Sequence, residues 1–289
     1  MQLIEGRAEW RAACERARRD GASLGLVPTM GALHRGHRSL VERAVGECDV
    51  AAASIFVNPI QFGDAGDLER YPRTLSADLE LLERAGCDLV FAPSVNEMYP
   101  EFPSLPSTTV HAGGRALGFE GADRPGHFDG VATVVLLLLN LTTPERAYFG
   151  EKDYQQLCVV RQMVADLGLG VSIVGCPIIR EEDGLALSSR NVRLSSTGHE
   201  AALSLRRALR VGEELLGDQR SVTEVDLAMG REIEAQDGAA LFYAAVVDPT
   251  TLERPTQPAL GDTLRLLVAA DVEGVRLIDN AGATFGRSQ

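Results

Sequence analysis

The sequence lacks the features of an exported or membrane-spanning protein. Its five cysteines are an odd number without a C-x-x-C pair, which favours neither a disulfide framework nor a zinc knuckle and indicates a reducing compartment. The longest apolar stretch, Val131–Leu141, is about half the length that a bilayer span requires, so it predicts a buried helix. Glu5, Arg7 and Glu9 stand where a signal peptide needs an apolar run. These absences predict a cytoplasmic protein that does not bind membranes.

Positive charge is also scarce. The chain has 28 lysines and arginines against 41 aspartates and glutamates, which gives a formal net charge of −13. Such a chain repels polyphosphate backbones and anionic lipids, which argues against general nucleic-acid binding. A small anion can still bind where the positive field is local. The 45% of hydrophobic and 24% of charged residues are ordinary for a folded protein, and 289 residues suit a large α/β domain with a smaller partner domain.

The first part of the chain alternates helical and strand-like segments. The expected helices are Arg7–Arg19, Arg35–Cys48, Ser76–Ala85 (with Ser76 as the N-cap), Val131–Leu141 and Gln155–Leu167; the expected strands are Leu24–Val27 (stopped by Pro28), Val50–Val57, Leu89–Phe91, Ala147–Phe149 and Val171–Cys176. Strands that alternate with helices imply right-handed crossovers and a parallel sheet. Ligands of such sheets bind at the carboxyl ends of the strands, so the residues after each strand are the candidates for function.

The pattern changes after Pro177. The expected helices are His199–Leu216 and Val222–Ala235, followed by the strands Leu241–Val247, Leu264–Ala270 and Val275–Ile278. This order predicts a small α+β domain. We therefore expect a first domain at 1–177 and a second at 178–289.

The first candidate segment is Pro28–His37, which joins a strand to a helix. The helix start presents backbone N–H groups that bind phosphate, and His34 and His37, three residues apart, lie on one side of the first turn. Gly31 and Gly36 have the spacing of a P-loop, but His37-Arg38 replaces its Lys-Ser/Thr pair, and the segment is not G-x-G-x-x-G. A histidine pair with no evident third ligand does not predict a metal site. Two purely structural histidines are the remaining alternative.

The second and third segments follow two other strands. Asn58 and Gln61 are neutral groups that can bind hydroxyls or a carboxylate, although an Asn-Pro by itself is typical of a turn. Lys152 is expected at a helix start, where a cation is unfavourable unless an anion lies between it and the helix end. Asp153 suits an N-cap, and Gln156 would face the same pocket.

The fourth and fifth segments are polar loops. Ser188, Ser189 and Arg190 suit phosphate oxygens, with a polar capping turn as the alternative. The segment contains no G-x-S-x-G, which argues against a hydrolase nucleophile. Arg124–Gly130 would line a pocket mouth or form a loop before the buried helix.

Together these segments resemble the pantothenate synthetase (pantoate–β-alanine ligase) family, within the H-x-G-H nucleotidyltransferase superfamily. P-T-M-G-A-L-H-x-G-H, F-V-N-P-x-Q-F, Y-P-R-T, R-P-G-H-F, F-G-E-K-D-Y-Q-Q and L-S-S-R-N occur in the family's order, without a departure at the motif positions. The resemblance runs from near Leu24 through Asn191, and a weaker match continues to Asn280. It implies a Rossmann-like parallel sheet with helices on both faces, plus a smaller C-terminal α+β domain that acts as a lid.

The resemblance also implies a reaction. The substrates would be pantoate, β-alanine and ATP, with Mg²⁺ carried mainly by the ATP phosphates and no protein metal site. The pantoate carboxylate would attack the α-phosphorus and release pyrophosphate. β-Alanine would then attack the pantoyl adenylate, giving pantothenate and AMP. The family further suggests a homodimer.

The roles of individual residues follow from the same resemblance. His37, His34, Lys152 and Arg190 would be catalytic, and pantoate would bind Gln61 and Gln156, backed by Asn58 and Met30. The implied ATP-binding residues are Met30, Gly31, Ala32, Leu33, His34, Arg35, Gly36, His37, Gly150, Glu151, Lys152, Asp153, Ile179, Leu187, Ser188, Ser189 and Arg190.

Other functions account for fewer of these residues. Another H-x-G-H nucleotidyltransferase would make a stable nucleotide product, but the neutral Gln61 and Gln156 suit a hydroxy acid better than a phosphorylated substrate. A nucleotide-binding regulator without activity would leave Lys152, Arg190 and both histidines, His34 and His37, without a role. A tRNA synthetase disagrees with the chain's length and net charge.

Overall fold

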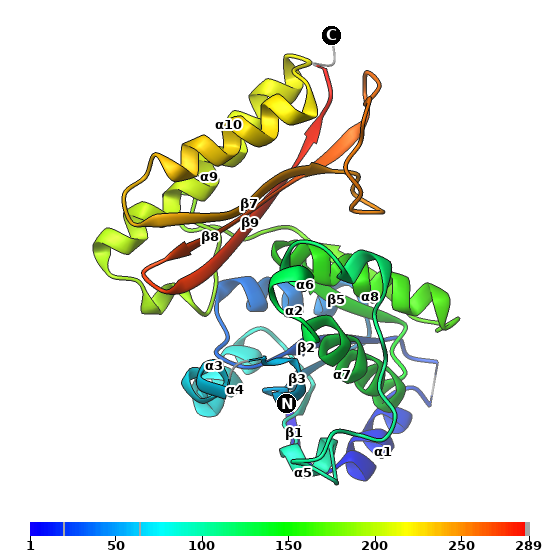
Figure 1. Cartoon of the computed structure of the whole chain (residues 1–289). Coiled ribbons are helices and arrows are strands. Elements are labelled where there is room, and N and C mark those ends of the chain that lie inside the picture. Colours follow the sequence, from blue (N-terminus) through cyan, green and yellow to red (C-terminus); the bar gives the residue numbers. More distant parts are fainter. Residues whose placement is uncertain (20, 64, 287–289) are drawn as a thin grey trace. The chain divides into compact units, whose positions relative to one another are not determined.

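The computed structural model describes residues 1–19, 21–63 and 65–286. The chain forms two compact units (Figure 1). The first comprises Met1–Glu151 and Gln155–Pro177, and the second comprises Lys152–Tyr154 and Ile178–Gln289. The short segment Lys152–Tyr154 thus groups with the second unit, although its position in the sequence places it within the expected first domain.

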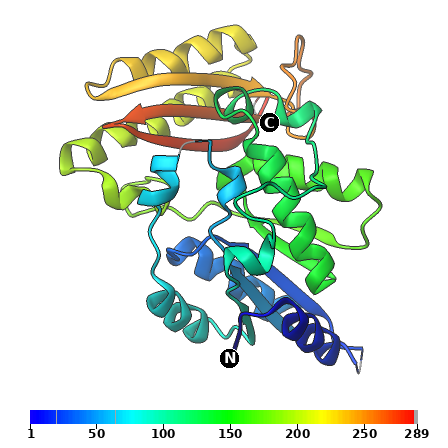
Figure 2. The same cartoon turned by 60° about the horizontal axis from the view of Figure 1, so that its bottom comes forward.

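A six-stranded parallel sheet forms the centre of the first unit (Figure 2). Its strands, β1 (Gln2–Ile4), β2 (Leu24–Thr29), β3 (Val50–Ile55), β4 (Leu89–Phe91), β5 (Arg146–Gly150) and β6 (Ser172–Cys176), lie in the order β1-β4-β3-β2-β5-β6. The predicted parallel α/β sheet is confirmed. β1 is an edge strand of three residues that the sequence pattern does not reveal.

Helices cover both faces of this sheet. The helices of the first unit are α1 (Arg7–Ala17), α2 (Arg35–Glu47), α3 (Ala65–Arg70), α4 (Leu75–Arg84), α5 (Val95–Met98), α6 (Glu120–Asp123), α7 (His127–Thr142) and α8 (Tyr154–Asp166), with short 3₁₀ turns at Pro59–Gln61, Gly114–Ala116 and Glu151–Asp153. On β4, Val90 packs with residues of α2 and α4, whereas its neighbour Phe91 stacks on Trp10 of α1 with ring centroids 5.0 Å apart. Successive strand residues point to opposite faces, so α2 and α4 lie opposite α1.

Three local expectations were wrong. Pro28 does not stop β2. The pairing of β2 with β5 covers only Gly25 and Leu26, so no β5 partner requires an N–H at Pro28, and the pairing with β3 continues past the proline. Ser76 is not an N-cap, since α4 begins one residue before it, at Leu75, and has Thr74 as its N-cap. The segment before the buried helix is not a loop up to Gly130, because α7 already begins at His127.

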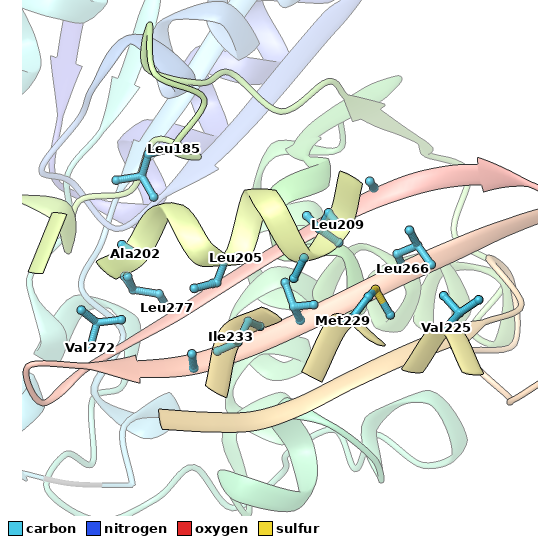
Figure 3. Close-up of a cluster of buried hydrophobic side chains, with 14 of the residues drawn as sticks. Leu185, Ala202, Leu205, Leu209, Val225, Met229, Ile233, Leu266, Val272 and Leu277 are labelled. Carbon is cyan, nitrogen blue, oxygen red and sulfur yellow. The ribbon is translucent and has the colours of Figure 1, made fainter. Parts of the chain in front are cut away.

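The second unit is an antiparallel sheet covered by two long helices (Figure 1). Its elements are α9 (Ser196–Gly217), α10 (Val222–Glu234), β7 (Ala239–Val247), β8 (Thr263–Val272) and β9 (Val275–Thr284), preceded by a 3₁₀ turn at Asn191–Arg193. Its core lies between helices and sheet, where Leu205 and Leu209 of α9 and Met229 of α10 meet Leu266 and Leu277 of the strands (Figure 3). The predicted α+β fold is confirmed.

No helix in the described ranges is long and apolar enough to cross a membrane. The apolar helix expected at Val131–Leu141 is instead largely buried as part of α7, with Val131, Val135 and Leu138 at most 4% exposed.

Candidate active site

Three connections of the first unit begin at one edge of its sheet. β2 and β5 are neighbours, and the chain builds the sheet outward from them in opposite directions. The carboxyl ends of such neighbouring strands are where open α/β sheets bind ligands. The loops after β2 and β3 contain Met30–His34 and Asn58–Gln61, and β5 ends at Gly150, which Glu151 follows. The topology therefore brings the first-unit candidates to a common edge.

The loop after β2 is held by a buried carboxylate. Asp78, at the start of α4 and 2% exposed, accepts the N–H of Leu33 at 2.8 Å and that of Ala32 at 3.1 Å. Gly31 and Ala32 both have positive φ, 83° and 50°. A Cβ on Gly31 would lie 3.0 Å from Asp78 Oδ2, so glycine serves both the backbone conformation and the close approach.

The two histidines form the N-terminal cap of α2. His34 is the N-cap and its Nδ1 accepts the N–H of Gly36 at 3.1 Å; the His37 Nδ1 accepts the N–H of His34 at 3.3 Å, as a glutamate does in a capping box. The rings lie 4.1 Å apart. Because both Nδ1 atoms accept, each neutral imidazole carries its proton on Nε2. The pair is half-buried, whereas the intervening Arg35 is exposed.

The candidate pantoate residues of the first unit lie in one chain of hydrogen bonds. Asn58 Nδ2 donates to Gln61 Oε1 at 2.9 Å, and Gln61 Nε2 donates to Met30 Sδ at 3.1 Å. Tyr99, which ends α5, donates its hydroxyl to Asn58 Oδ1 at 2.9 Å. Asn58 and Gln61 are buried, with 1% and 6% exposure. The structure thus brings Met30, Asn58 and Gln61 together and adds Tyr99 to them.

The start of α7 contacts the turn that contains Asn58 and Gln61. Buried His127 contacts the Gln61 carbonyl through Nδ1 at 2.9 Å, and Asn58 Nδ2 also donates to the Gly130 carbonyl at 3.1 Å. A Cβ on Gly130 would come within 2.6 Å of the Ile60 carbonyl oxygen. Only glycine allows the helix this close to the backbone of Gln61.

The two glutamines after β5 differ in their surroundings. Gln155, 6% exposed, donates to the carbonyls of Arg115 and Gly118 at 2.8 and 2.7 Å and accepts the N–H of Glu120 at 3.0 Å. It therefore anchors the segment before α7. Gln156 is half-buried, as are Gly150 and Glu151 at the end of β5.

The remaining candidates belong to the second unit. Lys152 lies in a 3₁₀ turn, with its side chain 18% exposed and Nζ 3.7 Å from Asp153 Oδ1. Asn280 of β9 donates to the Lys152 carbonyl at 2.9 Å, and Arg265 of β8 lies over the Tyr154 ring at 4.0 Å. These contacts tie Lys152–Tyr154 to the small sheet.

The loop before α9 folds back on itself. Leu187 donates its N–H to the Ile179 carbonyl at 3.0 Å, and the Ser188 hydroxyl accepts the N–H of Arg190 at 3.2 Å. Arg180 binds both carboxylate oxygens of Asp279, at 2.6 and 3.0 Å, which joins this loop to β9. The loop therefore presents half-buried Ser188, Ser189 and Arg190 from a braced turn.

The chemistry of these groups is that of anion binding. The two Nε2–H groups of the histidines, a lysine and an arginine are groups that can donate to phosphate oxygens. Within the described ranges, no three histidines, cysteines, aspartates or glutamates are grouped so that they would hold a metal ion. Sequence reasoning missed Asp78 and Tyr99, since nothing in their local patterns marks them. It noted His127 and Asn280 only as parts of motifs.

Comparison with known proteins identifies the family. The family model of pantoate-beta-alanine ligases matches residues 2–282. The pantothenate synthetase of Rubrobacter xylanophilus is 51% identical over 285 residues, which are 96% of this chain and 97% of the relative. The crystal structure of pantothenate synthetase from Thermus thermophilus has a TM-score of 0.90 at 50% identity and covers 97% of this chain and 99% of its own.

A further solved structure is the pantoate-beta-alanine ligase of Francisella tularensis, complexed with beta-gamma ATP and beta-alanine. It has a TM-score of 0.80 at 35% identity, with 97% of each chain covered. These matches span both units. The chain therefore belongs to the pantoate-beta-alanine ligase family and is an enzyme that ligates pantoate to β-alanine.

Proposed function

We propose that the chain performs this ligation in two steps at the candidate site. The carboxylate of (R)-pantoate attacks the α-phosphorus of ATP, the bond to the bridging oxygen breaks, and pyrophosphate leaves. The amine of β-alanine then attacks the carbonyl carbon of pantoyl adenylate. The products are pantothenate and AMP, and the amine loses one proton.

The histidine cap of α2 is the observation that carries this proposal. His34 and His37 each accept a backbone N–H through Nδ1, so each neutral ring has its proton on Nε2. Their place at a helix N-terminus adds the positive end of the helix dipole. This arrangement suits the charge that develops on phosphate oxygens in the transition state.

Pantoate needs no general base. Its carboxylate is already ionised at neutral pH, so catalysis of the first step is positioning and charge stabilisation. We assign pantoate to Gln61 and Gln156, with Asn58 and Met30 behind them. Neutral amides bind hydroxyl and carboxylate oxygens without adding a charge that would compete with the phosphates.

We assign ATP to the residues that the family resemblance implies. In this assignment the α2 loop holds phosphate oxygens, and Lys152, Arg190 and the hydroxyls of Ser188 and Ser189 stabilise the pyrophosphate that leaves. The backbone near Ile179 and Leu187 would hold adenine. Because the Leu187 N–H already donates to the Ile179 carbonyl, adenine would bind other backbone groups of these residues. Mg²⁺ would enter with the nucleotide, held mainly by phosphate oxygens.

The second unit would shield the adenylate from water until β-alanine arrives. We also propose a cytoplasmic homodimer. Sedimentation equilibrium of the purified chain tests the dimer, for which a mass near twice 31.0 kDa is expected.

Pyrophosphate exchange into ATP tests the first step. With magnesium and pantoate present and β-alanine absent, we expect exchange that depends on pantoate, and AMP release once β-alanine is added. Folded protein that binds ATP without exchange would contradict the adenylate step. It would favour a nucleotidyltransferase that makes a stable nucleotide product.

A further inference from the structure

A short relay of hydrogen bonds runs from Tyr99 to Gln61. The Tyr99 hydroxyl lies 2.9 Å from Asn58 Oδ1, and Asn58 Nδ2 lies 2.9 Å from Gln61 Oε1. Tyr99 and Asn58 are 4% and 1% exposed, and Gln61 is 6% exposed. The relay is therefore shielded from water, so each group depends on its partner in the protein.

The direction of every bond in this relay is determined. The Gly130 carbonyl can only accept, so the atom of Asn58 that faces it at 3.1 Å must be the amide nitrogen. Burial raises the pKa of the Tyr99 phenol, which therefore stays protonated and donates to Asn58 Oδ1. The same Asn58 nitrogen that meets Gly130 also meets Gln61, whose carbonyl oxygen must then accept. Consequently Gln61 directs its NH₂ group away from the relay.

We propose that Tyr99 is a positioning residue for the hydroxy-acid substrate, because through Asn58 it holds Gln61 as a hydrogen-bond donor. One N–H of Gln61 lies on Met30 Sδ at 3.1 Å, and the other is assigned to an acceptor oxygen of the substrate. The inference rests on the proposed pantoate-binding role of Gln61. That role leaves the direction of the hydrogen bond open. The inference specifies that the Gln61 amide donates and that a carboxylate or hydroxyl oxygen of the substrate accepts.

A merely structural role of Tyr99 makes a different prediction. The ring packs edge-on against Phe56, with centroids 5.9 Å apart, and this contact survives in a phenylalanine. Removing only the hydroxyl leaves Asn58 Oδ1 without its donor and loosens the amide that orients Gln61. If the relay acts on substrate, pantoate binding suffers more than the binding of ATP or β-alanine.

The test compares Tyr99→Phe with Tyr148→Phe. Tyr148 is also fully buried in the first unit, but its hydroxyl contacts Glu47 Oε2 at 3.1 Å and Cys48 Sγ at 3.4 Å on the opposite face of the sheet from Phe91. For Tyr99→Phe we expect the Kd and KM of pantoate to rise about tenfold, the loss of one buried hydrogen bond, with kcat and the KM of ATP and β-alanine within about twofold. Tyr148→Phe should leave all of them within about twofold.

A second variant reverses the polarity of the relay. In its ionised form the side chain of Asn58→Asp offers only acceptors, so Gln61 must then turn its NH₂ group inward and its carbonyl toward the ligand. We expect the Kd of pantoate to rise more than in Tyr99→Phe. Circular dichroism confirms that each variant is folded, and Tyr99→Phe decides the question if Asn58→Asp does not fold.

Calorimetric binding of pantoate separates this inference from the proposed function. Wild-type protein that binds pantoate without supporting exchange contradicts the proposed reaction alone. Tyr99→Phe that binds pantoate as tightly as wild type, or that weakens all three substrates alike, contradicts the relay alone. Wild-type protein that does not bind pantoate contradicts both.

Discussion

Asp78 Oδ1 accepts the backbone N–H of Leu33 at 2.8 Å, although 45 residues separate the two in the sequence. This bond, together with that from Ala32, holds the loop before the histidine cap in its positive-φ conformation. A carboxylate that touches no phosphate in our proposal thus determines where the donors of the cap lie. The same principle, a remote buried group that positions a binding group, applies to Tyr99 and Gln61.

The first prediction concerns Asp78. In Asp78→Asn one acceptor oxygen becomes an NH₂ group that faces a backbone N–H, so we expect the exchange rate to fall between about tenfold and a hundredfold, since small displacements of aligned groups have effects of this size. Asp88→Asn is the matched control, because Asp88 also accepts a backbone N–H, that of Ala51 at 2.9 Å, but just before β4 at the amino end of the sheet. It should change stability and leave the exchange rate nearly unchanged. Equal exchange rates in the two variants would argue against the proposed role of the loop.

The second prediction concerns His37. His37→Asn retains an oxygen that can accept the His34 N–H but lacks the Nε2–H donor, and we expect adenylate formation to fall about 10²–10³-fold in a folded protein. Single-turnover formation of AMP is the measurement. His111→Asn, in a side chain that is 81% exposed, is the control and should retain full activity. Near-normal turnover of the His37 variant would exclude the donor role.

The third prediction separates two adjacent glutamines. Gln155→Ala leaves two half-buried carbonyls and one buried N–H without this partner, so we expect the free energy of unfolding to fall by about 2 kcal/mol. Gln156→Ala should unfold like wild type but raise the KM of pantoate. Urea titrations and steady-state kinetics measure the two effects, with the surface residue Gln162→Ala on the same helix as control. The opposite assignment of effects would require exchanging the two roles.

The fourth prediction concerns the ion pair that braces the loop before α9. Asp279 is buried, with its side chain 3% exposed, and Asp279→Ala leaves the Arg180 guanidinium without its two carboxylate bonds. We expect a loss of about 3–5 kcal/mol in the free energy of unfolding, the usual cost of breaking a buried pair on one side. Glu80→Ala removes the partner of Arg84 in an exposed pair, with side chains 77% and 65% exposed, and should cost less than about 1 kcal/mol. Similar losses in the two variants would show that Asp279 does not brace this loop.

The fifth prediction is a pH dependence of stability. The hydrogen bond between Asp183 and His199 raises the pKa of the histidine above its ordinary 6.5 and lowers the pKa of the aspartate below its ordinary 3.8. The histidine contributes stability fully below pH 6.5 and loses it as the pH rises through its raised pKa. The aspartate contributes above pH 3.8 and loses its share as the pH falls through its lowered pKa.

The ion pair therefore contributes its full share of stability between pH 3.8 and pH 6.5, the ordinary pKa values of the two groups. We expect His199→Gln to lower the Tm most in this window, with a difference that shrinks above neutral pH. Thermal unfolding of both proteins from about pH 4 to pH 9 measures it. The pair is partly exposed, so salt should weaken the effect. A difference independent of pH would exclude the ion pair as its cause.

Local pattern was sufficient for most of the first unit. The apolar run at Val50–Val57 predicts a buried strand, of which Val50–Ile55 form β3, and Gly86 after α4 has the positive φ that glycine readily adopts. The predictions at Pro28 and Ser76 were wrong because the local conformational preference of each residue is weaker than the effect of its neighbours in the folded structure. In β2 one edge lacks a partner at Pro28, and Thr74 precedes the helix that Ser76 was expected to start.

The sequence by itself determined the alternation of helices and strands, the motif that ends in two histidines and the membership of a ligase family. These depend on residues that are near one another in the chain. Only the tertiary structure decided the direction of the Asn58 amide and the burial of Asp78 against the α2 loop. It also decided the grouping of Lys152 with a sheet whose Asn280 lies 128 residues further along the chain. Hydrogen bonds between distant segments leave no periodic trace in the sequence, because each partner is selected by the fold and not by its neighbours in the chain.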